Sequence, residues 1–318
     1  VGENFADITA AVYAIGGWAD GYSNAVPRLL SGLKGPKKGL VGPWAHRYPH
    51  FAEPGPRIGF LHETLRWWDY WLKGIETGIM QEPEYRVWME EFVPPAPYYK
   101  ERPGRWVAEP CWPSPNVAMR DFHLAPGSLG AKPGPAAGLP IVSPLSVGML
   151  AGHWCAYGLS PDQPSDQRDE DGKSVVFDSA PLDGPIEILG AAEIELDVTA
   201  EKPQAQLCVR LNDVAPDGAS LRVSYGLLNL THRESHEHPT PLEPGRTYRV
   251  RIKLNDAAHA FPRGHRIRIA ISSSYWPIAW PSPETAGLVL ATEGSVLHLP
   301  VRAPRAEDAT LAPFAPAE

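Results

Sequence analysis

The chain has 318 residues, 43% of them hydrophobic and 21% charged, which is the range of ordinary globular proteins. A chain of this length buries a core without metals or disulfides, and no apolar run reaches the roughly 18 residues of a membrane span. The net charge of −8 gives no reason to expect nucleic acid as a partner.

The three cysteines, Cys111, Cys155 and Cys208, are far apart and form no CxxC pair. We therefore expect no zinc site, and nothing in the sequence calls for a cofactor. An odd number of cysteines leaves at least one free thiol, which slightly favours a reducing compartment such as the cytoplasm.

Residues 1–80 alternate between strand and helix signals. The elements predicted here are a buried strand over Ala10–Gly17, a short helix over Asn24–Leu33, a strand over Lys38–Pro43 and a helix over Phe60–Leu72. The last helix carries apolar residues at helical spacing, and Gly74 is its expected stop. This pattern predicts an α/β unit, but two strands are too few for a stable sheet. Either further strands precede the chain, or this half-sheet pairs with something else.

Residues 81–302 show little helical periodicity. Short runs rich in β-branched and aromatic residues alternate with Pro, Gly and Asp clusters, which predicts a two-sheet β-sandwich of the jelly-roll kind. The expected strands are Tyr85–Met89, Lys173–Phe177, Ile186–Val198, Gln206–Asn212, Leu221–Asn229, Arg246–Leu254, Arg266–Ser272 and Ser295–Val301. The Pro-rich stretches Pro94–Pro115 and Pro126–Pro144 are expected to be connections without elements, and residues 303–318 a flexible tail.

Two short motifs each follow an apolar strand. Asp20 lies in Gly-Gly-Trp-Ala-Asp-Gly-Tyr, and His46 ends Gly-Pro-Trp-Ala-His. The carboxyl ends of parallel strands meet at one edge of a sheet, where α/β proteins place their sites. A histidine that moves a proton and a carboxylate that fixes its tautomer are two members of a catalytic triad, and acid before histidine is the α/β-hydrolase order. Taken singly, Asp20 is more often a turn residue and His46 a surface histidine; the pair in this order favours chemistry.

Several motifs in this order resemble the cocaine-esterase and X-prolyl dipeptidyl-peptidase family of serine hydrolases (CocE/NonD type). They are Gly16–Tyr22, Gly42–His46, Leu65–Gly74, Asp166–Arg168, Val214–Gly218 and Phe261–Ile269. The resemblance implies the C-terminal part of an α/β-hydrolase domain followed by a jelly-roll domain. It also implies that Asp20 is the triad acid and His46 the general base.

The family's nucleophilic Ser sits in a strand-to-helix elbow upstream of the acid, and the chain contains no such elbow; neither Ser23 nor Ser31 follows a strand as an elbow requires. We therefore expect an acyl hydrolase acting on a small ester, an amide or a short X-Pro peptide, with this chain supplying Asp and His. The alternative is a non-catalytic binding or packing module. In a third arrangement, a separate N-terminal half pairs with this chain, or the chain forms a homo-oligomer through its open sheet edge.

Weaker candidates lie elsewhere. Trp44 is a candidate substrate contact, and Trp276 and Trp280 are weaker ones, because aromatic walls are common in small-molecule sites. Such tryptophans more often pack an interface between domains. A second cluster has ligand types that suit zinc, but its composition favours a solvated turn. It consists of His232, Glu234, His236, Glu237 and His238.

Overall fold

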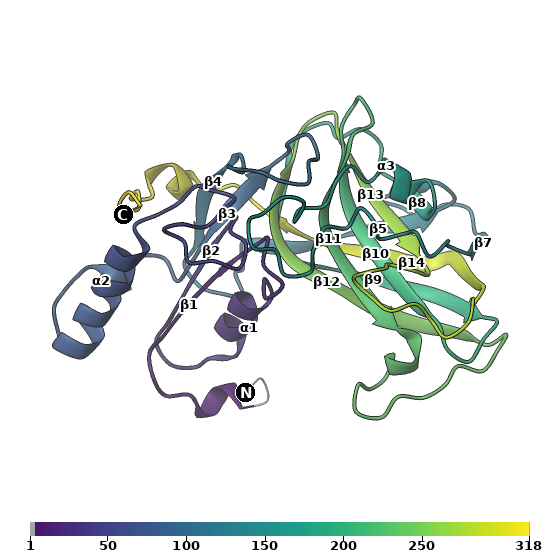
Figure 1. Cartoon of the computed structure of the whole chain (residues 1–318), viewed down its shortest axis with the longest axis horizontal. Coiled ribbons are helices and arrows are strands. Elements are labelled where there is room, and N and C mark those ends of the chain that lie inside the picture. The colour runs from purple at the N-terminus through teal and green to yellow at the C-terminus, as the bar shows by residue number, and fades with distance from the viewer. Residues whose placement is uncertain (1–3, 318) are drawn as a thin grey trace.

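The computed structural model describes residues 4–317 (Figure 1), in which an α/β unit lies beside a larger β-rich part. In the α/β unit β1 (Val12–Gly17) pairs in parallel with β2 (Lys37–Gly42), which pairs in parallel with β3 (Tyr85–Glu91). The helices are α1 (Ala25–Gly32) and α2 (Phe60–Lys73), and the 3-10 helices are η1 (Phe5–Asp7) and η2 (Ile79–Gln81). The predicted parallel pair is confirmed, and its sheet extends past residue 80.

The half-sheet of the α/β unit is continued by the β-rich part. β3 pairs antiparallel with β4 (Gly104–Glu109) and, over two residues, in parallel with β12 (Thr247–Phe261). The half-sheet therefore pairs with a later segment of the same chain on its β3 side, and a preceding strand beside β1 stays a prediction. β1 is the last strand at the other end of the sheet order among the described residues.

The β-rich part forms one continuous path of hydrogen-bonded strands, in the order β12-β9-β14-β5-β6-β8-β13-β10-β11. The further strands are β5 (Val117–Ala125), β6 (Ser128–Gly130), β7 (Gly138–Ile141), β8 (Val175–Asp178), β9 (Ile186–Ala200), β10 (Gln206–Val214), β11 (Ser220–Asn229), β13 (Arg266–Ser272) and β14 (Leu288–Arg302). Leu196 of β9, Leu211 of β10 and Ile269 of β13 belong to one apolar cluster, so the two ends of the path enclose a common core. Only short helices, α3 (Arg168–Asp171) and η3 (Leu230–His232), occur in this part among the described residues.

Two sequence predictions were wrong. The stretch Pro94–Pro115 contains β4, and Pro126–Pro144 contains β6 and β7. Their flanking prolines and glycines suggest loops, but β4 is held by pairing with β3, and β7 by pairing with β14. Partners distant in sequence therefore stabilise strands that local composition does not favour.

The segment after residue 302, expected as a flexible tail, returns to the α/β unit (Figure 1). It contains the 3-10 helix η4 (Ala306–Thr310), and the Phe314 ring packs 4.9 Å from that of Trp106. The fully buried Arg302 guanidinium pairs with Glu109 of β4 at 2.7 Å, Glu187 of β9 at 3.2 Å and Asp308 of η4 at 2.8 Å. This ion network joins the tail to both parts.

Candidate functional site

The ends of β1 and β2 bring Asp20 and His46 together. Gly17 and Gly42, the last residues of the two strands, are paired in register, and the loop after each strand carries one of the two side chains. His46 Nδ1 lies 2.9 Å from Asp20 Oδ2. The other carboxylate oxygen, Oδ1, accepts the Tyr22 backbone N–H at 3.0 Å. The geometry is the one the sequence predicts; the catalytic roles stay predictions.

The two partners differ in exposure, and the contact of Asp20 with Nδ1 leaves the other imidazole nitrogen, Nε2, free. The Asp20 side chain is 13% exposed and the His46 side chain 43%. A carboxylate at Nδ1 favours the tautomer with its proton there, which leaves Nε2 as a proton acceptor. Among residues 4–317 no side chain hydrogen-bonds to Nε2, and Ser31 Oγ instead donates to the Pro27 carbonyl at 2.8 Å.

A close backbone approach at Gly17 fixes the two loops against each other. The Trp44 carbonyl accepts the Ala19 N–H at 3.2 Å, and a Cβ on Gly17 would lie 2.0 Å from the same oxygen. Trp44 itself is 1% exposed, and its Nε1–H donates to the Pro56 carbonyl at 2.8 Å. This burial gives Trp44 a packing role under the histidine loop, and its contact with substrate stays a prediction. The Trp276 and Trp280 rings pack against each other at a tilt of 60°, and they do not line the cavity at His46.

A segment that the sequence did not single out, His153–Tyr157, lies against the pair. Its Ala156 carbonyl accepts the His46 backbone N–H at 2.8 Å, and the Tyr157 ring meets the imidazole edge-on at 5.4 Å. Asp162 Oδ2 holds the segment by accepting the Tyr157 N–H at 2.7 Å. No sequence pattern predicts that this segment contacts His46. Only its aromatic residues and its cysteine could have marked it as part of a site.

The same segment places Cys155 beside Asp20 and His46. One ligand atom from each of the three residues lies within 4.8 Å of the others. Burial raises the pKa of the Cys155 thiol, and a hydrogen bond from the Gly21 backbone N–H opposes this shift.

The candidate metal cluster around His232 does not come together within residues 4–317. His232 and His236 approach each other at 3.4 Å, but no third ligand joins them.

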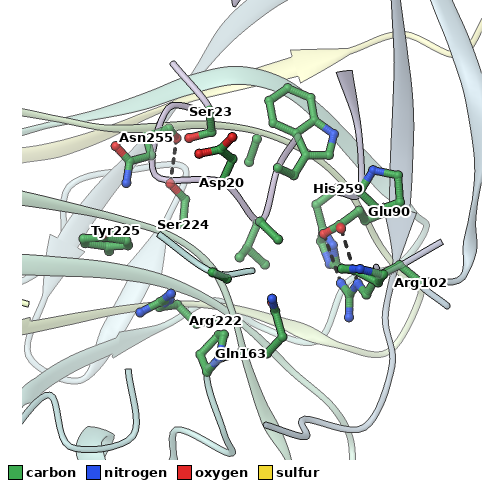
Figure 2. A pocket seen from close by; sticks show the side chains of 18 of the residues that line it. Asp20, Ser23, Glu90, Arg102, Gln163, Arg222, Ser224, Tyr225, Asn255 and His259 are labelled. Atoms are coloured by element: carbon green, nitrogen blue, oxygen red, sulfur yellow. Dashed lines mark hydrogen bonds and ion pairs between the residues drawn. The ribbon is translucent and has the colours of Figure 1, made fainter. Parts of the chain in front are cut away.

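Two cavities meet at Asp20. The first opens beside His46, and much of its wall is apolar or aromatic; it includes Ile15, Trp44, His46, Tyr48, Phe51, Phe60 and Tyr157. The second is more polar, and Asp20 is one of the residues that line it (Figure 2). In Figure 2 the Asp20 and Ser23 side chains lie on one side of it, with Arg222 and Gln163 on the other. A ligand at His46 thus meets apolar walls, whereas a ligand in the second cavity meets polar groups.

Comparison with known proteins identifies the family. The family model for the X-Pro dipeptidyl-peptidase C-terminal non-catalytic domain matches residues 77–306, and the model for X-Pro dipeptidyl-peptidase (S15 family) matches residues 1–48. The chain belongs to the CocE/NonD-type hydrolase family. Within the described residues no helix is both long enough and apolar enough to cross a membrane.

The relatives of this CocE/NonD-type chain are esterases and peptidases by name. Cocaine esterase of a Rhodococcus species is 23% identical over 318 residues, which covers 90% of this chain and 52% of the relative. A Mycobacterium bovis protein named as a candidate serine esterase is 29% identical over 303 residues, 83% of this chain and 45% of its own length. The chain therefore spans about half the length of the curated relatives it matches.

Solved structures share the fold. An aminopeptidase from a marine-sediment Thaumarchaeota archaeon aligns with a TM-score of 0.73 at 19% identity, covering 93% of this chain and 56% of that one. A CocE/NonD family hydrolase from Staphylococcus aureus aligns with a TM-score of 0.71 at 14% identity, covering 94% and 55%.

Proposed function

We propose that the protein is a serine-type acyl hydrolase in which this chain supplies the acid, Asp20, and the general base, His46, of a Ser–His–Asp triad. The supporting observation is the 2.9 Å contact between His46 Nδ1 and Asp20 Oδ2 at the carboxyl edge of two parallel strands. The alternative of a non-catalytic packing module is not favoured, because the relatives are named as hydrolases.

In this mechanism His46 Nε2 takes the proton of a Ser hydroxyl as that oxygen attacks the substrate carbonyl carbon. Asp20 stabilises the resulting imidazolium through Nδ1–H, and Nε2–H then protonates the leaving group. Water then attacks the acyl group on the Ser, with His46 again as the general base, and the carboxylic acid product is released. The Ser and the oxyanion-hole donors are proposed to come from the segment that precedes the matched region in the longer relatives.

The substrate we propose is a small-molecule ester or amide, or a short X-Pro peptide. The wall beside His46 includes Tyr48, Phe51 and Tyr157, which suits an apolar or aromatic group at the scissile bond. We further propose that residues 1–80 complete an α/β-hydrolase domain and that residues 81–302 form a jelly roll.

The test compares the whole protein with this chain. We expect the whole protein to hydrolyse p-nitrophenyl butyrate or Ala-Pro-p-nitroanilide, to take up one fluorophosphonate per molecule by intact mass spectrometry, and to lose about 10⁴-fold or more of kcat on His46→Ala. This chain by itself should take up none. An adduct on a Ser of this chain, or near-normal turnover of His46→Ala, would contradict the proposal.

A further inference from the structure

The Cys155 thiol has no part in the proposed hydrolysis, yet it lies at the dyad. Asp20, His46 and Cys155 each place a ligand atom within 4.8 Å of the other two, and they provide one carboxylate oxygen, one imidazole nitrogen and one sulfur. These three ligand types are those that bind Zn²⁺ in proteins. His46 is the exposed member of the three, so the cluster is open on its side.

The three ligands are held by backbone bonds. The Ala156 carbonyl, next to Cys155, accepts the His46 N–H at 2.8 Å, so the loops carrying sulfur and imidazole are joined directly. Asp162 Oδ2 accepts the Tyr157 and Leu159 N–H groups at 2.7 and 2.8 Å, which fixes the far side of the Cys155 loop. Asp20 is fixed by the Tyr22 N–H. Since each ligand is positioned by contacts that a metal would not use, the arrangement is already built before binding.

We propose that Asp20, His46 and Cys155 form a binding site for a thiophilic divalent cation of the Zn²⁺ type, with His46 Nδ1 as the imidazole ligand. Nδ1 and Asp20 Oδ2 are 2.9 Å apart, and two atoms bound to one tetrahedral Zn²⁺ lie about 3.3 Å apart. Small shifts are therefore enough for the cation to replace the proton between them. The three protein ligands leave the fourth position to water.

Binding changes the tautomer of His46. The Cys155 S–H bond breaks and its proton passes to solvent, because the thiolate is the ligand. A neutral imidazole that binds a metal through Nδ1 carries its proton on Nε2, so this proton moves from one nitrogen to the other through water. Nε2 then has no lone pair to accept the Ser proton. This inhibitory consequence rests on the proposed function, whereas cation binding does not.

The test is a Co²⁺ titration of this chain followed by absorption, with Cys155→Ser and a matched Cys111→Ser control. Cys111 is an exposed thiol outside the cluster. We expect one equivalent of Co²⁺ to give a thiolate-to-cobalt charge-transfer band, which Zn²⁺ bleaches, which Cys155→Ser abolishes and which Cys111→Ser keeps. His46→Ala should weaken Co²⁺ binding about tenfold or more. Circular dichroism checks that each variant folds.

Absence of the band, or a band that survives Cys155→Ser, would overturn the site. In the whole protein, Zn²⁺ should lower ester hydrolysis in the wild type and have less effect on Cys155→Ser, each relative to its own metal-free rate. If the cobalt band is present but Zn²⁺ leaves hydrolysis unchanged, the inhibitory consequence is wrong and the site stands. If the whole protein hydrolyses no ester, the proposed function fails, and the band still decides the site.

Discussion

At the scale of single residues, Asp256 is a charged group in an unfavourable place. It lies on β12 and lines both the polar cavity that Asp20 also lines and a neighbouring cavity, and its backbone N–H donates to Asn24 Oδ1 at 2.7 Å. Burial raises the pKa of its carboxyl to about 6, against the attraction of Lys253 and Arg28. The folded state therefore holds this proton more tightly than the unfolded state does.

The sign of the pH effect follows. Since the folded pKa exceeds the unfolded one, stability from this group is fully present below about pH 4 and is lost as the pH rises to about 6. We expect Asp256→Asn to raise the free energy of unfolding at pH 7 by up to about 3 kcal/mol and to have little effect at pH 4. Urea unfolding from pH 4 to 8 measures this, with the exposed Asp183→Asn as control. Equal pH profiles for wild type and Asp256→Asn would contradict it.

Asp20 and His46 were predictable because each lies just after an apolar strand, and parallel strands end at a common edge. Cys155 and Tyr157 were not predictable, because they reach the site from the β-rich part on a loop without periodicity. What places them is tertiary: the Ala156 carbonyl on His46 N–H and the Asp162 carboxylate. The sequence carried no local sign of either contact.

At the scale of elements, the crossing of the β1 and β2 loops at Gly17 controls the dyad. A Cβ there would overlap the Trp44 carbonyl, two residues before His46. We expect Gly17→Ala to destabilise the fold by about 1–3 kcal/mol and to lower the kcat of the whole protein for esters, because the His46 loop must move away. Gly184→Ala is the matched control, since nothing lies within 4 Å of its added Cβ. Thermal melts and ester hydrolysis measure the two effects; Gly17→Ala behaving like Gly184→Ala would contradict the argument.

Elements also show where sequence patterns stop being informative. α1, α2 and the β1–β2 pair were predicted, because helical spacing and apolar runs are local signals. β4 and β7 were not, since they are made by distant partners, β3 and β14. The apolar spacing in α2 predicted the helix itself, but it did not indicate which side of the helix is buried.

At the scale of the whole molecule, α2 turns apolar side chains outward. Leu61, Leu65, Trp68 and Leu72, which recur at helical spacing, are all exposed, whereas the buried positions of the helix are Glu63 and Trp67. The Tyr13 ring of β1 packs against the Trp67 ring of α2, and β1 is the end strand of the sheet among residues 4–317. A free strand edge beside an exposed apolar helix face is typical of an interface. We propose that the preceding half present in longer relatives covers it.

Substitution of Trp68 tests this in two contexts. Its side chain is 52% exposed here, so Trp68→Glu should leave the stability of this chain nearly unchanged. In the whole protein the same change places a charge in the interface, and we expect a loss of about 2 kcal/mol or more, together with lower hydrolysis. Trp280→Glu, at a tryptophan 80% exposed in a loop away from α2, is the matched control and should be neutral in both. Chemical unfolding of the two variants in both contexts decides it. If Trp68→Glu has the same small effect in both contexts, α2 does not face the preceding half. A loss already present in this chain would instead mean that a second copy covers the helix, which sedimentation would show as a dimer that dissociates on substitution.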